Sequence, residues 1–168
     1  MEKLEVKLLS ENGTLPTKAD KASAGYDIYA SEKIYIKPQE KTLIPTDLAI
    51  NIPEGYVGLL TSRSGVSSKT NLVIETGKID SGYQGHMKIN IKNDNQLTDD
   101  IAAYRLKIDE TKAYMRGYTN RGSYVIKKGD KLAQLVIVPI ATPELELVDD
   151  FSNQTERGEK GFGSSGTR

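Results

Sequence analysis

The nine residues from Gly77 to Gly85, Gly-Lys-Ile-Asp-Ser-Gly-Tyr-Gln-Gly, combine one carboxylate, one aromatic ring and three glycines. Apolar runs with the character of β-strands lie on both sides of this stretch. Glycines at both ends of a short segment are typical of a tight turn, or of close approach by a ligand or a second chain. Asp80 and Tyr83 would then face the same small molecule. A plain β-hairpin whose turn is capped by Asp80 is the alternative.

A second stretch, Thr61 to Ser68, has the residue types of a phosphate clamp: Thr-Ser-Arg-Ser-Gly-Val-Ser-Ser. Arg63 would bind two phosphate oxygens at once, and a short helix after Ser64 would add the amides of its N-terminus. An ordinary polar turn that caps a helix fits the same residues. The pattern Gly-x-x-x-x-Gly-Lys-Ser/Thr is absent, so phosphates would be bound here without a P-loop.

A glycine-rich stretch, Arg157 to Gly166, contains one basic and one aromatic side chain, Arg157 and Phe162. Glycine amides and serine hydroxyls can surround phosphate oxygens. Arg157 would add a bidentate phosphate contact, and Phe162 could stack on a base. A solvated linker is the alternative, and residues 151–168 as a whole predict a mobile tail.

Two further polar residues stand in apolar surroundings. Asp27, in Ala-Gly-Tyr-Asp-Ile, could contact a hydrated Mg²⁺, which keeps several waters and takes few carboxylates; an aspartate in a hydrogen-bonded turn fits equally well. Gln134 is the one polar side chain in the apolar run Leu132 to Val138, so it must have a hydrogen-bond partner. The single histidine, His86, is expected to be structural rather than catalytic.

The composition excludes several classes of function. With no cysteine and one histidine, the chain cannot form disulfides, zinc–thiolate sites, multi-histidine metal sites or a Ser-His-Asp triad with a histidine to spare. A formal net charge of zero argues against direct nucleic-acid binding, which needs excess Lys and Arg. No apolar run is long enough to span a membrane, and the first residues do not resemble a signal peptide, so a cytoplasmic location is expected.

The hydrophobic pattern predicts an all-β protein. At 168 residues, one domain with a proper core is expected. Short alternating runs punctuated by Pro and Gly indicate a sandwich or barrel rather than βαβ units. Pro45 is expected to end one run, Leu132 to Val138 should be a central strand, and Leu145 to Val148 should be a further strand.

The segment Asp94 to Gly122 interrupts this rhythm. It is polar, has mixed charge and is far longer than an ordinary connection between strands. Ile101 to Met115 could carry a short helix. Its Tyr, Met and Arg residues are types enriched at interfaces, although a tolerated surface insertion is the alternative.

Five of these stretches, in this order along the chain, together resemble the motifs of the trimeric dUTPases. They are Ala24–Ile28, Arg63–Gly65, Gly77–Gly85, Gly129–Leu135 and Arg157–Gly166. The resemblance implies a jelly-roll homotrimer with active sites at subunit interfaces. It divides the chain into a β domain, 1–150, and a flexible C-terminal arm, 151–168, that completes a neighbouring site.

The resemblance also implies a Mg²⁺-dependent hydrolysis of dUTP to dUMP and pyrophosphate by attack of water on the α-phosphorus. Asp80 would be the general base, and Tyr83 would exclude a 2′-hydroxyl. Asp27 would contact Mg²⁺ through water. The remaining implied substrate contacts are the backbone at Gly77 and Ile79 for uracil, Arg63, Ser64, Gly65 and Gln134 for the phosphates, and Arg157, Phe162, Gly163 and Ser164 from the arm.

The insertion 94–122 resembles the extra segment of staphylococcal phage dUTPases. That resemblance implies a second role, binding and inactivating the repressor protein of a mobile pathogenicity island, in a host bacterial cytoplasm if the chain is phage-encoded. A purely regulatory protein-binding module and a dCTP deaminase-like relative on the same fold remain as alternatives to the hydrolase.

Overall fold

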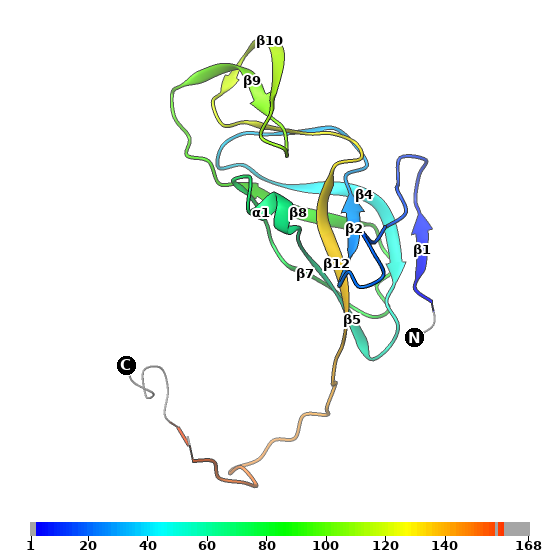
Figure 1. Cartoon of the computed structure of the whole chain (residues 1–168). Helices are drawn as coiled ribbons and strands as arrows, with labels where there is room; N and C mark the ends of the chain where they lie inside the picture. The colour runs from blue at the N-terminus through cyan, green and yellow to red at the C-terminus, as the bar shows by residue number, and fades with distance from the viewer. Residues whose placement is uncertain (1–2, 157, 160–168) are drawn as a thin grey trace.

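The computed structural model describes residues 3–156 and 158–159 (Figure 1). This part of the chain is built almost entirely of β-strands, which confirms the all-β prediction. Its elements are β1 (Glu5–Leu8), β2 (Tyr26–Tyr29), β3 (Ile34–Ile36), β4 (Lys41–Asn51), β5 (Tyr56–Ser62), α1 (Ser64–Ser67), β6 (Leu72–Ile74), β7 (Gly77–Ile79), β8 (Met87–Asn93), β9 (Ile101–Leu106), β10 (Lys112–Asn120), β11 (Tyr124–Ile126) and β12 (Lys131–Pro139).

The strands form three four-stranded sheets. Their orders are β1-β4-β8-β6, β2-β12-β5-β7 and β10-β9-β11-β3, and every pair is antiparallel except β9 with β11. Strands that are neighbours in a sheet are mostly distant in sequence, so the sheets bring separate motifs together.

Alternation along the strands creates the core. In β8, Met87, Ile89 and Ile91 are buried while the residues between them are more exposed, because successive side chains of a strand point to opposite faces. They join one cluster of buried side chains with Ile44 and Leu48 of β4. β12 lies between β2 and β5, so the expectation of a central strand is confirmed. Its Leu132, Ala133 and Leu135 are fully buried, whereas residues 136–138 are half-buried.

Pro45 does not end a strand. β4 continues from Lys41 to Asn51, with a shift in its pairing to β8 between Pro45 and Leu48. Pro45 itself stays in register opposite Lys88, and its carbonyl accepts the Ser31 amide on the side away from β8. β1 pairs with β4 only from Leu48 onward, so no ladder hydrogen bond needs an N–H at Pro45. The prediction of a break was therefore wrong.

Two other expectations were wrong. Residues 101–115 form no helix, because β9 and β10 pair as a hairpin in which Tyr104 faces Tyr114 with ring centroids 6.0 Å apart; aromatic residues favour such cross-strand pairs. Residues 145–148 form no strand. Leu145 and Leu147 are 99% and 100% exposed, and the segment after β12 extends away from the sheets (Figure 1), so it has no strand of the described chain to pair with.

Tyr124 connects the hairpin to the body of the protein. Its ring is fully buried, its hydroxyl donates to Glu110 in the turn between β9 and β10, and that hydroxyl accepts the N–H of Asn71 at 3.2 Å. Burial, reinforced by the Glu110 carboxylate, raises the pKa of the phenol to about 12, so the hydroxyl remains a donor at neutral pH.

We predict that Tyr124→Phe lowers the free energy of unfolding by about 1–2 kcal/mol, because the part-buried N–H of Asn71 loses its acceptor and Glu110 loses its donor. Thermal melting at a fixed protein concentration measures the change. Tyr118→Phe is the control, since Tyr118 is 71% exposed. Equal melting temperatures for the two variants would contradict the assigned role of Tyr124.

Candidate functional site

A buried aspartate joins three of the motifs. The carboxylate of Asp27 on β2 accepts from the Arg63 Nε at 2.7 Å and from the Lys131 Nζ at 2.9 Å. The strands explain this meeting, because β12 lies between β2 and β5 with Gln134 opposite both Asp27 and Thr61. Residues more than a hundred positions apart therefore form one positively charged group around a single carboxylate.

Arg63 lies where β5 passes into the short helix. It is the N-cap residue of α1, and its carbonyl accepts from the amides of Val66 and Ser67. The helix after Ser64 that the sequence predicts is thus present. Ser64 and Gly65 are exposed, and an added Cβ on Gly65 would meet no atom within 4 Å. The first amides of a helix lack intrahelical partners, so this open end can bind an anion.

Gln134 has the partner that its half-buried position requires. Its amide nitrogen donates to the Ser62 carbonyl at 3.4 Å. A Cβ on Gly25 would lie 3.2 Å from the Gln134 Oε1, so the glycine allows β2 and β12 to approach closely at this point. The amide oxygen of Gln134 therefore lies against the segment that carries Asp27.

Asp80 and Tyr83 lie on a turn between two sheets. β7 pairs with β5, placing Ile79 opposite Gly58, whereas β8 pairs with β4 and β6. β7 and β8, the strands next to the turn, are therefore not partners. The apolar run before them, β6, does pair antiparallel with β8, with Ile74 opposite Ile91. The two apolar runs thus pair as the hairpin alternative expects, but the connection between them is long and includes β7. Asp80 is exposed, and none of the side-chain hydrogen bonds described for residues 3–156 involves its carboxylate.

The Tyr83 ring has a fixed orientation. Its hydroxyl donates to the His86 carbonyl at 3.2 Å, and an added Cβ on Gly85 would lie only 2.6 Å from the Tyr83 Oη. Tyr83 and Asp80 both line an open cavity of about 340 Å³, together with Leu43, Lys78, Ile79, His86, Met87 and Lys88. The residues Asp27, Arg63 and Gln134 do not line this cavity, so one chain presents two separate groups of site residues.

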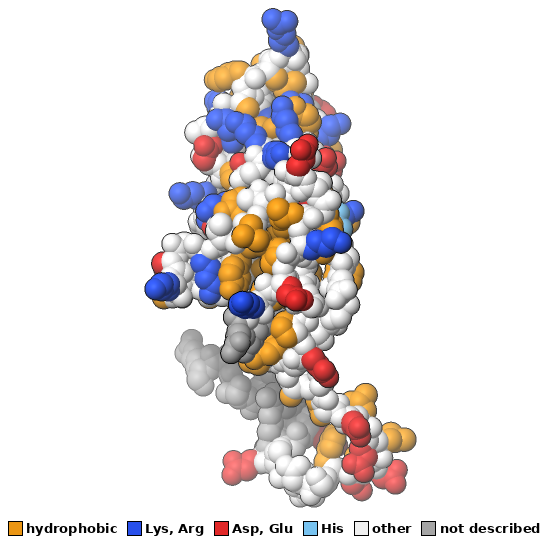
Figure 2. All heavy atoms as spheres, turned by 90° about the vertical axis from the view of Figure 1, so that its right-hand side faces the viewer, with side chains coloured by type: hydrophobic (Ala, Val, Ile, Leu, Met, Phe, Trp, Pro, Cys, Tyr) orange, Lys and Arg blue, Asp and Glu red, His pale blue; other side chains and the backbone are white. Residues whose placement is uncertain are grey.

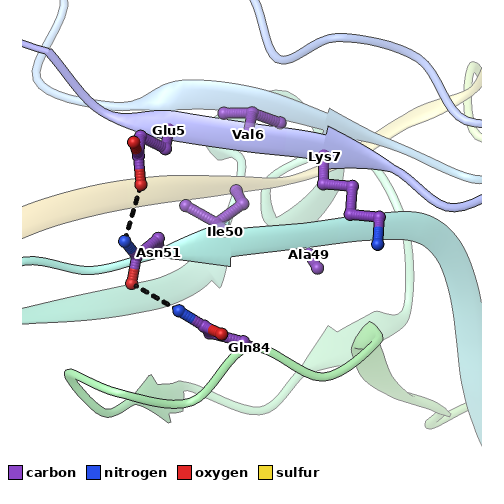
Figure 3. A pocket seen from close by; sticks show the side chains of 7 residues that line it. All are labelled: Glu5, Val6, Lys7, Ala49, Ile50, Asn51 and Gln84. Atoms are coloured by element: carbon purple, nitrogen blue, oxygen red, sulfur yellow. Dashed lines mark hydrogen bonds between the residues drawn. The ribbon is translucent and has the colours of Figure 1, made fainter.

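A second cavity, of about 270 Å³, lies on the other side of the turn, beside β1 and β4 (Figure 3). Here the Gln84 amide donates to the Asn51 Oδ1 at 3.3 Å, and the Asn51 amide donates to the Glu5 carboxylate at 2.7 Å. These bonds tie the residue next to Tyr83 to the end of β4.

The side chains around Asp27 can hold a metal ion only indirectly, through water. Within the described residues no three His, Asp or Glu side chains come together as a metal cage. Both oxygens of Asp27 accept from cations, but a carboxylate offers about four lone-pair sites. Asp27 can therefore still accept from a water on a hydrated Mg²⁺ that phosphates hold, which is the way this ion is usually bound.

Sequence reasoning missed Lys131 as a site residue. Contact with the Asp27 carboxylate raises the pKa of its amine, and the amine also lies 5.5 Å from the centre of the Tyr29 ring. Its place in the motif Gly129–Leu135, three residues before Gln134, was the available signal.

The predicted contacts Arg157, Phe162, Gly163 and Ser164 lie outside the described residues. The described part of the chain holds no helix with the length and apolarity that a membrane crossing requires.

Comparison with known proteins gives one consistent result. The sequence profile of the dUTPase family matches residues 11–105 and 112–166. A probable deoxyuridine 5′-triphosphate nucleotidohydrolase of Schizosaccharomyces pombe is 35% identical over 161 residues, which is 96% of each chain. The gap in the profile match, 106–111, covers the last residue of β9 and the turn between β9 and β10.

Two solved structures of phage dUTPases have the same fold. That of Staphylococcus bacteriophage 80alpha, with bound dUpNHpp, matches with a TM-score of 0.95 and 56% identity over 99% of both chains, and it is described in terms of phage dUTPases that control the transfer of virulence genes. That of the D95N mutant from Staphylococcus aureus phage phi11 matches with a TM-score of 0.88 and 54% identity over 90% of this chain and all of that one. It is described as revealing coordination of a structural Mg(II) ion.

We predict that Asp27→Asn lowers the melting temperature, because Arg63 and Lys131 would face each other without a neutralising charge. The pKa of Lys131 is raised in the folded state, so the stability from its pairing is present at neutral pH and lost as the pH rises through that pKa. The gap between wild type and Asp27→Asn should therefore narrow above pH 10.5, the ordinary value.

The exposed variant Asp99→Asn is the matched control and should melt like the wild type throughout. Melting curves recorded from pH 7 to pH 11.5 measure both effects. A gap of constant size across this range would show that Lys131 draws no stability from Asp27.

Proposed function

This chain belongs to the dUTPase family and hydrolyses dUTP, and we propose that each active site is completed between the subunits of a homotrimer. Hydrolysis yields dUMP and pyrophosphate, which keeps uracil out of DNA and supplies dUMP. The observation that carries the proposal is the separation of Asp80 and Tyr83 from the group around Asp27 in one chain. One active site must contact the base, the sugar and the three phosphates of dUTP at once, so a second copy would supply the missing half.

Asp80 is the general base in this proposal. Its carboxylate is exposed at the edge of the cavity that Tyr83 lines, where a water molecule can reach it. It would accept a proton as that water attacks the α-phosphorus in line with the leaving pyrophosphate. Phosphoryl transfer depends mainly on positioning and charge neutralisation, which suits a site without cysteine.

Recognition of the deoxynucleoside falls to the same turn. The Tyr83 ring would lie under the deoxyribose and leave no room for a 2′-hydroxyl. Backbone groups at Gly77 and Ile79 would bind the uracil edge, and the pairing of β7 with β5 keeps this backbone extended. A site that binds a base edge with fixed backbone groups discriminates strongly, because a wrong base leaves buried polar groups unpaired.

The phosphates would be bound by Arg63, Ser64, Gly65 and Gln134 of a neighbouring copy. The open end of α1 and the positive group beside it support this assignment. Mg²⁺ would be held by the triphosphate, with Asp27 contacting it through water, and would help to neutralise phosphate charge. Arg157 would bind the terminal phosphate, Phe162 would stack on uracil, and Gly163 and Ser164 would close over the phosphates.

The segment after β12 supports the exchange of arms between subunits. Leu145 and Leu147 are almost completely exposed, and Phe151 is 87% exposed. Apolar side chains on an extended segment gain about 25 cal/mol for each Å² that they remove from water. Docking on a neighbouring β domain, 1–150, would bury them and would deliver the arm, 151–168, to another active site.

A second function is proposed for the insertion 94–122, whose core is the β9–β10 hairpin. Lys and Arg side chains gather at this end of the molecule (Figure 2). Tyr114 is 78% exposed, and Tyr118, also exposed, follows it in a bulged part of β10. Exposed tyrosines beside basic residues suit a protein interface. Since a similar phage dUTPase is described as controlling virulence-gene transfer, the partner would be the repressor protein of a mobile pathogenicity island.

We predict that Asp80→Asn retains nucleotide binding and loses hydrolysis by a factor of at least about 10² to 10⁴, the usual contribution of a general base. Pyrophosphate release measures turnover, and titration with a non-hydrolysable dUTP analogue measures binding. Ser81→Ala, the adjacent exposed residue, should behave like the wild type. Turnover of Asp80→Asn within tenfold of the wild type would remove Asp80 from this role.

We also predict that the double substitution Tyr114→Ala and Tyr118→Ala weakens repressor binding at least about tenfold, since exposed tyrosines are common binding hot spots, and leaves dUTP hydrolysis unchanged. A pull-down with the purified repressor and a pyrophosphate assay measure the two effects. Tyr56→Phe, distant on β5, serves as the control. Undiminished binding by the double variant would place the interface elsewhere, on the active-site face.

A further inference from the structure

The single histidine has a contact pattern that its neighbours in sequence do not explain. The Nε2 of His86 accepts the backbone N–H of Asp47 at 2.9 Å and that of Thr46 at 3.3 Å. A ring nitrogen that accepts N–H groups must present its lone pair, so this geometry places the ring N–H on Nδ1. The Asp47 carboxylate also lies 3.4 Å from Nε2, but it accepts from the Ser10 hydroxyl instead, which lowers its pKa.

The two N–H groups belong to the bulge in β4. Pairing with β8 skips Thr46 and Asp47, and Asp47 has a positive φ of 52°. An unpaired residue in a bulge leaves its N–H without a ladder partner, and burial of such a group is costly. The Thr46 hydroxyl, which is fully buried, donates to the Met87 carbonyl. This hydrogen bond holds the bulge in place. The two remaining backbone N–H groups, of Thr46 and Asp47, both donate to the Nε2 of His86.

The backbone of His86 contacts Tyr83. Its carbonyl accepts the Tyr83 hydroxyl at 3.2 Å, and Gly85 gives the Tyr83 ring the space it occupies. On the far side of the turn, Gln84 is tied to Asn51 of β4 (Figure 3). His86 thus connects the bulge, through its ring, to the Tyr83 ring, through its carbonyl, and it lines the same cavity as Asp80 and Tyr83.

We propose that His86 is a positioning residue for dUTP hydrolysis, which fixes the Tyr83 ring and the turn that carries Asp80 by holding this turn against the β4 bulge. The proposal rests on the proposed role of Tyr83 in sugar recognition. Without the Nε2 acceptor, the Gln84–Asn51 contact would be the remaining side-chain hydrogen bond described between the turn and β4. The ring would then move relative to the sugar, and the discrimination between dUTP and UTP would fall.

Two substitutions of similar size separate positioning from bulk. In His86→Gln, an amide oxygen can take the place of the Nε2 acceptor, whereas His86→Leu fills the space without an acceptor. We expect His86→Leu to lower kcat about tenfold or more, because small misplacements of reacting groups are costly. The ratio of kcat/KM for dUTP over UTP should fall by a similar factor, and His86→Gln should keep both within about threefold of the wild type.

Tyr83→Phe provides an independent arm, since it removes the hydroxyl that donates to His86. If the two residues act through one contact, the double variant of Tyr83→Phe with His86→Leu should lose no more discrimination than the worse single variant. Full additivity of the two losses would contradict the proposal. So would equal losses in His86→Leu and His86→Gln, because a need for bulk alone affects both variants alike.

The wild-type protein supplies a test that needs no variant to fold. Nitrogen-15 NMR of the labelled imidazole at neutral pH should show a proton on Nδ1 and none on Nε2, and a proton on Nε2 would overturn the proposal. Retention of wild-type kcat and nucleotide discrimination by a folded His86→Leu would also overturn it. Failure of the proposed function is distinct, because it would appear as hydrolysis by Asp80→Asn, whatever His86 does.

Discussion

The carboxylate of Asp27 between Arg63 and Lys131 is the interaction on which the rest of the site depends. It joins β2, the end of β5 and the start of β12, and the half-buried pairing holds two cations that would otherwise repel each other. Removing one partner of such a group leaves an uncompensated charge, which costs more than the pairing contributes. The position of α1 and its open N-terminal end follows from this constraint, because Arg63 is the residue from which the helix begins.

The two groups of site residues explain why this fold suits assembly. The positive group lies at one end of the β2-β12-β5-β7 sheet, and the Asp80 turn connects the edge of that sheet to β8. Within one chain, the cavity lined by Asp80 and Tyr83 does not include Asp27, Arg63 or Gln134. Exposed Leu145, Leu147 and Phe151 on the segment after β12 would give a physical reason for association in the proposed homotrimer. An enzyme of this kind would be inactive as a single chain and would form its sites together with its interfaces.

The turn from Gly77 to Gly85 is fixed by contacts outside itself. Gln84 is tied to Asn51, and His86 is tied to the bulge in β4. Both contacts come from the neighbouring sheet, so the turn is held from two sides while Asp80 stays exposed to water. The β9–β10 hairpin, at the other end of the molecule, is also held by a contact from outside itself. The buried Tyr124 hydroxyl donates to Glu110 in the turn of the hairpin.

The sequence alone determined the all-β class, the absence of cysteine chemistry, the short helix after Ser64 and the segments that bear Asp27, Arg63, Asp80, Tyr83 and Gln134. These features depend on local alternation, on residue type and on motif spacing, which can be read along a chain. The tertiary structure decided the features that require a partner. Pro45 remains within β4 because its backbone polar atoms face away from β8, where no strand needs its N–H. Residues 101–115 form parts of two strands and their turn because Tyr104 can pair with Tyr114. Residues 145–148 have no strand of the described chain to pair with. The contacts of Lys131 and His86 were also decided by the tertiary structure. Each binds a residue at least 39 positions away, and only the packing of the sheets brings such pairs together.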